Sequence, residues 1–126
     1  MVAGAQVPTI LVVDDEESLR LYMTRVLQDD GYAVIEAASG LEALSLLEDR
    51  DTERVHLVIT DVLMPGMSGM DLATLLAQRP SSPPVLFVSG SHNLSDVPGP
   101  LLTKPFLPAD LSAVAGNLLR KQLNPA

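Results

Sequence analysis

The sequence predicts an α/β fold in which helices cover both faces of a parallel β-sheet. Short apolar runs alternate along the chain with longer segments in which apolar residues recur at helical spacing. Neighbouring parallel strands need crossover connections, and a helix between successive strands supplies them. The chain has 126 residues, the usual size of one domain. We therefore expect one domain with its core over about residues 9–122 and tails at 1–8 and 123–126.

The first elements follow the order strand, helix, strand, helix. Residues 9–13, Thr-Ile-Leu-Val-Val, have the character of a buried strand. From Glu16 onward, apolar residues fall on one helical face until Gly31, a residue type that commonly ends helices. Residues 32–35 are the second predicted strand. Ser39 then opens the second helix, because a glutamate three residues later completes the spacing of a capping box.

The middle of the chain repeats this order. Residues 56–60 are the third predicted strand. Ser68 is the expected N-cap of the third helix, because an aspartate lies three residues later. The proline-rich segment 80–84 ends that helix before a fourth strand at residues 85–88.

The interval before the last strand is short. Only 14 residues separate Ser89 from Lys104, and they include the fifth predicted strand at 101–103. A mean helix takes about 11–12 residues and its loops need several more. We therefore expect the fourth helix to have one or two turns, or to be absent. The chain closes with an amphipathic helix over residues 108–123.

The charge balance excludes several classes of function. The net charge is −8, the isoelectric point is about 4.4, and lysine occurs only at positions 104 and 121. These basic side chains are too few to form a positively charged surface along the phosphates of a nucleic acid. We therefore expect no direct nucleic-acid binding. Cysteine is absent, which excludes disulfides and thiolate metal sites. No apolar run approaches the roughly 20 residues of a membrane span. We expect no membrane insertion and a cytoplasmic location.

Polar residues follow four of the five predicted strands. In open α/β sheets, ligands bind outside the carboxyl ends of the strands, so parallel strands would bring these residues to one edge. They are Asp14 and Asp15 after the first strand, Asp61 after the third, Ser89 after the fourth and Lys104 after the fifth. The second strand ends at residues 36–38, which we place away from the site.

Three carboxylates in a small space need an offsetting charge. Two unit charges about 4 Å apart repel by about 4 kcal/mol at an effective dielectric constant of ~20. One lysine cannot neutralise three acids, whereas a lysine and a divalent cation can. Oxygen ligands without His or Cys select Mg²⁺, Mn²⁺ or Ca²⁺, and we favour Mg²⁺ because it leaves positions for phosphate oxygens. Asp61, alone at the end of its strand, is the candidate nucleophile for a phosphoryl group, with Lys104 and Ser89 stabilising its oxygens.

Four ordered motifs connect these residues to a family. The motifs are Val12-Val13-Asp14-Asp15-Glu16, then Asp61-Val62-Leu63-Met64-Pro65-Gly66-Met67-Ser68-Gly69, then Val88-Ser89-Gly90, and finally Lys104-Pro105-Phe106. Together they resemble the receiver domain of two-component response regulators, over about Ile10 to Leu119. The resemblance implies a flavodoxin-like, doubly wound sheet with strand order 2-1-3-4-5, and a single receiver domain over residues 1–126.

The resemblance also implies a phosphoacceptor and a metal site. Asp61 looks like the residue that takes a phosphoryl group from a phosphohistidine on a sensor histidine kinase or a histidine phosphotransfer protein. Asp14, Asp15 and Asp61 look like Mg²⁺ ligands, with Mn²⁺ as a substitute. The backbone of Val62 or Leu63 would complete the set, and we take the Leu63 carbonyl.

The remaining implied roles concern the response to phosphate. Ser89 and Lys104 look like the phosphate-sensing pair, and a cis Lys104–Pro105 bond would aim the lysine at Asp61. By this resemblance the protein is a signalling domain that phosphorylates itself and loses the phosphoryl group slowly, rather than a metabolic enzyme. Its output would act through a downstream protein target.

Two features depart from the family pattern. Receivers commonly carry Tyr or Phe three residues before the lysine, where rotation of the ring reports phosphorylation, but this chain has Leu101. The short interval after Ser89 resembles the reduced fourth helix of some receivers attached to hybrid histidine kinases. Both departures lie on the surface through which the family usually signals, so the resemblance supports the chemistry more strongly than the output.

Other interpretations stay open beside this one. The acids at 14–17 could simply favour a helix N-terminus. A phosphorylation-independent interaction module would keep the fold, and Leu101 favours it, whereas the intact acid triad and Lys104 oppose it. A Mg²⁺ phosphohydrolase with an aspartyl nucleophile is weaker still, because such enzymes usually carry a second acid two residues after the nucleophile, where this chain has Leu63.

Overall fold

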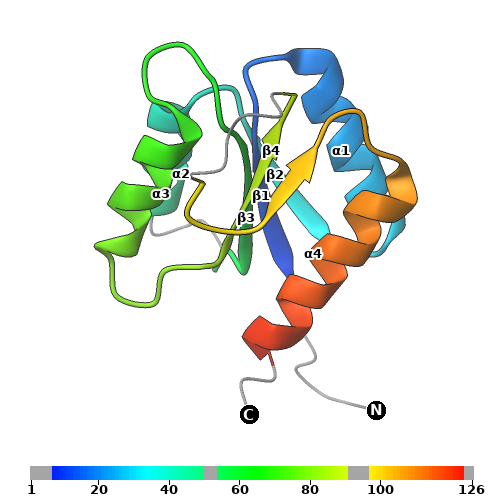
Figure 1. The fold of residues 1–126 in the computed structure, drawn as a ribbon. Coiled ribbons are helices and arrows are strands. Elements are labelled where there is room, and N and C mark those ends of the chain that lie inside the picture. Colours follow the sequence, from blue (N-terminus) through cyan, green and yellow to red (C-terminus); the bar gives the residue numbers. More distant parts are fainter. Residues whose placement is uncertain (1–6, 50–53, 91–96, 124–126) are drawn as a thin grey trace.

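The computed structural model describes residues 7–49, 54–90 and 97–123, and it shows one sheet with helices on both faces (Figure 1). All strand pairings are parallel, and the order across the sheet is β2-β1-β3-β4-β5. The strands are β1 (Thr9–Val13), β2 (Ala33–Ala37), β3 (Leu57–Asp61), β4 (Val85–Ser89) and β5 (Leu101–Thr103). The predicted α/β class, parallel sheet and strand order are confirmed.

In the described part of the chain, two helices cover each face of the sheet (Figure 1). They are α1 (Glu17–Asp29) and α4 (Pro108–Leu123) on one face, and α2 (Gly40–Glu48) and α3 (Gly69–Ala77) on the other. Between β4 and β5 the sequence predicts a helix of one or two turns, or none. Residues 97–100 form no helix, and residues 91–96 lie outside the described residues. No helix in the described part of the chain is long and apolar enough to cross a bilayer.

The second strand differs from its predicted bounds. It begins at Ala33 and extends to Ala37, whereas the sequence predicts residues 32–35. Tyr32 is excluded because its backbone N–H donates to the Leu27 carbonyl, 3.1 Å away, and so closes the end of α1. The positive φ of Gly31, 97°, permits this closure. The strand extends further because Asp14 N donates to the Ala37 carbonyl at 3.1 Å.

Helix caps follow the predicted signals. At α3 the capping box is complete: Ser68 Oγ accepts from Asp71 N at 3.1 Å, and the Asp71 carboxylate accepts from Ser68 N at 3.3 Å. At α2, Ser39 Oγ accepts from Glu42 N at 3.1 Å, but the Glu42 carboxylate accepts from the preceding Ala38 N at 2.7 Å. Both helices therefore begin where a serine satisfies one of the free N–H groups of the first turn.

Alternate residues of the central strands supply two separate cores. Because successive side chains point to opposite faces, a strand buried on both faces reads as a continuous apolar run. Ile10 and Val12 of β1 pack with α1 and α4, whereas Leu11 and Val13 pack with α2 and α3. All four are fully buried. The rigid β1 that results positions the residues that follow it.

On the face of the sheet covered by α1 and α4, one buried hydroxyl makes no hydrogen bond to the other described residues. Thr24 is 4% exposed and its Oγ1 has no partner there. We expect Thr24→Val, which replaces the hydroxyl with a methyl group of similar size, to raise the free energy of unfolding by about 1 kcal/mol in urea titrations. The matched control is Thr74→Val on α3, because the exposed Thr74 Oγ1 donates to Met70 O at 2.9 Å. An equal gain in both variants would contradict the explanation.

Candidate functional site

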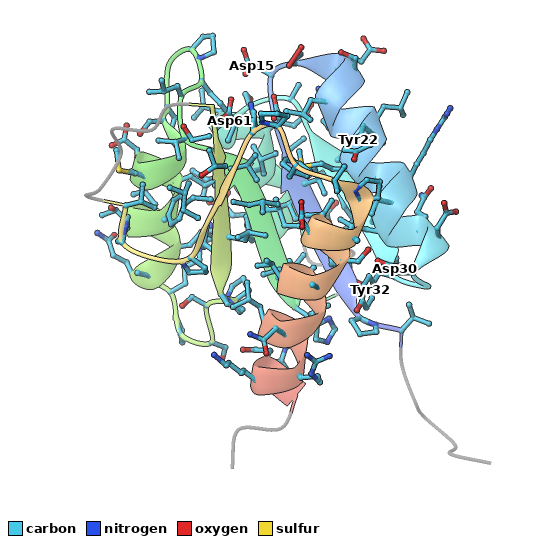
Figure 2. The ribbon with its side chains drawn as sticks, turned by 45° about the vertical axis from the view of Figure 1, so that its right-hand side comes forward. Asp15, Tyr22, Asp30, Tyr32 and Asp61 are labelled. Atoms are coloured by element: carbon cyan, nitrogen blue, oxygen red, sulfur yellow. The ribbon has the colours of Figure 1, made fainter. Side chains whose placement is uncertain are left out.

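Three acids converge at the carboxyl edge of the sheet, as the sequence predicts. Asp14 and Asp15 directly follow β1, and Asp61 is the last residue of β3. One carboxylate oxygen of each acid lies within 4.8 Å of the others. Figure 2 shows Asp15 and Asp61 on this edge, above the sheet. The spacing of the three oxygens suits a bound metal ion.

The surroundings of Asp14 leave one of its oxygens for such an ion. Asp14 is fully buried, and its Oδ1 accepts a 2.8 Å hydrogen bond from Glu16 N. Its Oδ2 is also buried but has no partner among the described residues. A buried carboxylate oxygen without a donor is unfavourable. A divalent cation shared with Asp15 and Asp61 would satisfy it, so the donor set fits Mg²⁺.

Lys104 and Ser89 lie on the same edge. Lys104 Nζ is 3.5 Å from Asp61 Oδ1, with side chains 25% and 12% exposed. The Lys104–Pro105 peptide bond is cis, which confirms the prediction. Lys104 N donates to Ser89 O at 2.8 Å, joining the ends of β5 and β4, and Ser89 is buried. The structure thus brings the three acids and the Lys104 ammonium together, and it joins Ser89 to Lys104 through the backbone.

Burial raises the pKa of both Asp14 and Asp61 above the ordinary value of 3.8. For Asp14, the charge of Asp61 raises the pKa further, while the hydrogen bond from Glu16 N and the charge of Lys104 oppose the rise. For Asp61, the charge and hydrogen bond of Lys104 oppose the effect of burial. Lys104 therefore does not offset the desolvation of the two acids, and a further cation would stabilise their charged forms.

The loop after Asp61 is held close to the sheet. Val62 N donates to Val88 O at 3.1 Å, and Val62 O accepts from Gly69 N at 2.8 Å. The side chain of the intervening Leu63 is 64% exposed. At Gly69 there is no room for a side chain, because an added Cβ would collide with the Asp61 carbonyl oxygen. The glycine thus sets how closely α3 begins beside Asp61.

Arg20 is a site neighbour that sequence reasoning missed. Its Nη1 donates to the Asp14 carbonyl at 2.8 Å, and its Nε donates to Glu36 Oε1 at 3.1 Å. Glu36 itself lies outside the acid cluster, in line with the placement of the second strand end away from the site. The available signal was the position of an arginine in the first turn of the helix that follows two adjacent acids.

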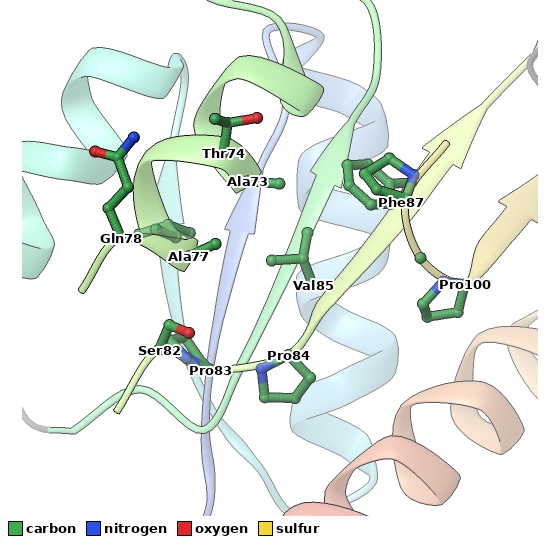
Figure 3. A pocket seen from close by; sticks show the side chains of 13 residues that line it. Ala73, Thr74, Ala77, Gln78, Ser82, Pro83, Pro84, Val85, Phe87 and Pro100 are labelled. Carbon is green, nitrogen blue, oxygen red and sulfur yellow. The ribbon is translucent and has the colours of Figure 1, made fainter. Parts of the chain in front are cut away.

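The cavity shown in Figure 3 has a different character. It has a volume of about 550 Å³ and lies between α3 and β4, near the amino end of that strand. Ala73 and Ala77 line one wall, and Val85, Phe87 and Pro100 line the other. None of its lining residues belongs to the acid edge. With few polar groups, it offers no comparable chemistry.

Comparison with known sequences points to one family. The family model for the response regulator receiver domain matches residues 10–115. Sensor kinase CckA of Brucella abortus (strain 2308) is 39% identical over 121 residues, which cover 90% of this chain and 13% of that protein. The aerobic respiration control protein ArcA of Escherichia coli (strain K12) is 33% identical over 126 residues, 94% of this chain and 51% of that protein. The chain thus spans about half of one relative and much less of the other.

Solved structures give the same result. The receiver domain of the hybrid histidine kinase CckA has a TM-score of 0.76 and 34% identity, covering 88% of this chain and 98% of that one. The chemotaxis response regulator CheY4 of Vibrio cholerae has a TM-score of 0.79 and 28% identity, covering 90% and 99%. Both match nearly end to end.

The raised pKa values predict a pH dependence for the metal-free protein. Between 3.8 and the raised values, the folded protein holds protons that the unfolded chain releases, so stability falls as the pH rises through this window. Asp14→Asn keeps an oxygen for Glu16 N but cannot ionise. We expect it to raise the free energy of unfolding at pH 7 by on the order of 1 kcal/mol, and to abolish stabilisation by Mg²⁺.

Urea titrations of metal-free protein at pH 7 and below pH 3.8 test this expectation. The gain should shrink at the lower pH, where Asp14 is protonated in wild type. Asp29→Asn, at the exposed far end of α1, is the control. A destabilised Asp14→Asn protein at pH 7 would show that the acid cluster is not under electrostatic strain.

Gly69 allows a prediction about the loop that follows Asp61. Gly69→Ala must displace the Asp61 backbone, so we expect a loss of about 2 kcal/mol or more in the free energy of unfolding. Gly40→Ala is the matched control, because Gly40 is also the first residue of a helix and is buried. There the nearest atoms belong to the flexible end of Met67. Equal losses in the two variants would contradict a backbone clash at Gly69.

Proposed function

The chain belongs to the response regulator receiver family of two-component signalling, and on that premise we propose that Asp61 accepts a phosphoryl group from a phosphohistidine. The donor would be a sensor histidine kinase or a histidine phosphotransfer protein. The observation that carries the proposal is the arrangement around Asp61. A buried oxygen of Asp14 without a partner among the described residues belongs to the same cluster, and the Lys104 ammonium lies 3.5 Å from Asp61 Oδ1.

The transfer itself needs little covalent chemistry from the protein. A carboxylate oxygen of Asp61 attacks phosphorus, the bond from phosphorus to the histidine nitrogen breaks, and that nitrogen regains its electron pair. The product is an acyl phosphate on Asp61. Lys104 would offset negative charge on the phosphoryl oxygens, and the Ser89 hydroxyl would donate to one of them. Water attack on the acyl phosphate would later restore the free acid slowly.

Mg²⁺ is the proposed cofactor, with Mn²⁺ as a substitute. Asp14, Asp15 and Asp61 would hold it through their carboxylates. The Leu63 carbonyl is preferred over that of Val62, because Val62 O already accepts from Gly69 N at 2.8 Å. When bound, the cation supplies positive charge that offsets the acids and the incoming phosphoryl oxygens.

The biological setting is proposed at the level of the family. Receivers of two-component systems act between histidine kinases and downstream targets, so we place this chain in the cytoplasm as a signalling domain with a core over residues 9–122. Its target would be a protein rather than nucleic acid, given the net charge of −8.

A second candidate is a receiver-like module whose interactions do not depend on phosphorylation. One observation favours it: Leu101 stands on the edge strand β5, 36% exposed, where receivers commonly use an aromatic ring. An aliphatic side chain there would transmit phosphorylation differently or not at all. The two candidates make opposite predictions about Asp61.

We expect intact mass to increase by one phosphoryl group when the protein is incubated with acetyl phosphate and Mg²⁺. The gain should disappear without Mg²⁺ and in Asp61→Asn, because the amide cannot form an acyl phosphate. Asp29→Asn serves as the control for loss of an exposed acid. A protein that binds Mg²⁺ by calorimetry but gains no mass would support the phosphorylation-independent module instead.

A further inference from the structure

Arg20 links the acid cluster to a strand that contributes no ligand to it. The residue lies in the first turn of α1, and its side chain is only 16% exposed. One guanidinium nitrogen donates to the Asp14 carbonyl at 2.8 Å, and another contacts Glu36 of β2 at 3.1 Å. A planar guanidinium with several donors is suited to hold two acceptors at once in fixed positions.

The hydrogen bonds of Asp14 show what this contact controls. Asp14 N donates to Ala37 O at 3.1 Å, its carbonyl accepts from Arg20, and its Oδ1 accepts from Glu16 N at 2.8 Å. Only Oδ2 has no partner among the described residues. Three contacts thus fix the residue and leave one oxygen for the cluster. Arg20 makes the only one of these contacts that comes from a side chain.

The Glu36 carboxylate explains why the Arg20 guanidinium can lie beside the proposed Mg²⁺ site. An unpaired guanidinium near the acids would repel Mg²⁺, but the Glu36 carboxylate offsets its charge. The contact with Glu36 already restricts the Arg20 side chain. The side chain therefore loses less conformational entropy when it also contacts Asp14. Val12 and Glu36 are paired in the register of β1 and β2, which places Glu36 within reach of the helix that follows β1.

We propose that Arg20, held by Glu36, is a positioning residue of the metal site: it fixes the Asp14 backbone so that Oδ2 stays available to the cation. The inference rests on the proposed function, because the metal site is part of that function. Groups that orient metal ligands commonly change metal affinity by about 10–100-fold when they are removed.

The sign of the effect separates positioning from simple charge. If Arg20 acted only as a nearby positive charge, its removal would strengthen Mg²⁺ binding. If it positions Asp14, Arg20→Met should weaken Mg²⁺ binding by about tenfold. Arg20→Lys should recover part of the affinity, because one ammonium can contact the Asp14 carbonyl without the fixed geometry of the guanidinium. Glu36→Gln should weaken binding to a smaller extent.

The chain contains a matched control pair. Arg79 Nη2 and Glu48 Oε1 are also 3.1 Å apart, but this exposed pair joins the ends of α3 and α2 and contacts none of the clustered acids. Arg79→Met and Glu48→Gln change the net charge as the test variants do. We expect both to bind Mg²⁺ with wild-type affinity.

The experiment is calorimetric titration of each variant with Mg²⁺ at one pH and ionic strength, with urea titrations to establish that the variants are folded. Weaker binding in Arg20→Met and Glu36→Gln, with partial recovery in Arg20→Lys, would support the inference. If Arg20→Met does not fold, Arg20→Lys decides the question, because it keeps the charge and loses only the fixed geometry of the guanidinium: affinity below that of wild type supports positioning, and unchanged affinity overturns it. Lower stability with unchanged Mg²⁺ affinity would overturn it, as would tighter binding.

The same titrations distinguish failure of the inference from failure of the proposed function. Wild-type protein that binds Mg²⁺ but never gains a phosphoryl group would refute phosphoryl transfer and leave the role of Arg20 intact. Wild-type protein that is phosphorylated, beside an Arg20→Met variant of unchanged affinity, would refute the role of Arg20 alone. Absence of Mg²⁺ binding in wild type would overturn the inference directly.

Discussion

The parallel register of β1 and β3 is the constraint on which the candidate site depends. Val13 is paired with Thr60, so the next residues along the two strands are Asp14 and Asp61. Both are buried, and burial raises both pKa values because water no longer solvates the charges. The sheet therefore holds two desolvated carboxylates close together, and a cation would stabilise their charged forms.

Strands β4 and β5 and helix α1 make further contacts around Asp14 and Asp61. The ends of β4 and β5 are joined by the bond from Lys104 N to Ser89 O, 2.8 Å, which places the lysine beside Asp61. Helix α1 contributes twice. Arg20 contacts the Asp14 carbonyl. The Tyr22 ring, which is labelled in Figure 2, lies 6.0 Å from the ring of Phe106, in the segment after the lysine. Helix α1 thus contacts both the residue that follows β1 and the segment that follows β5.

In this receiver domain, the acids proposed for the chemistry lie at the ends of β1 and β3, and Leu101, at the position expected to transmit the output, lies on β5. Every residue of the acid edge follows the family pattern, whereas Leu101 on β5 departs from it. Family members such as the sensor kinase CckA and the control protein ArcA are much longer than this chain. Proteins of different length and organisation thus share this domain, and their surfaces away from Asp61 can differ.

The sequence by itself determined the strands, the helices and the identity of the acids. Those features are local: apolar period, Ser68 before α3, and Asp61 directly after an apolar run. Only the tertiary structure decided that one oxygen of Asp14 has no partner in the described part of the chain, and that Arg20 links Asp14 to Glu36. These contacts join separate elements, and their partners depend on how α1 packs against β2. Local propensity carries no information about such distances, whereas the register of the sheet fixes them.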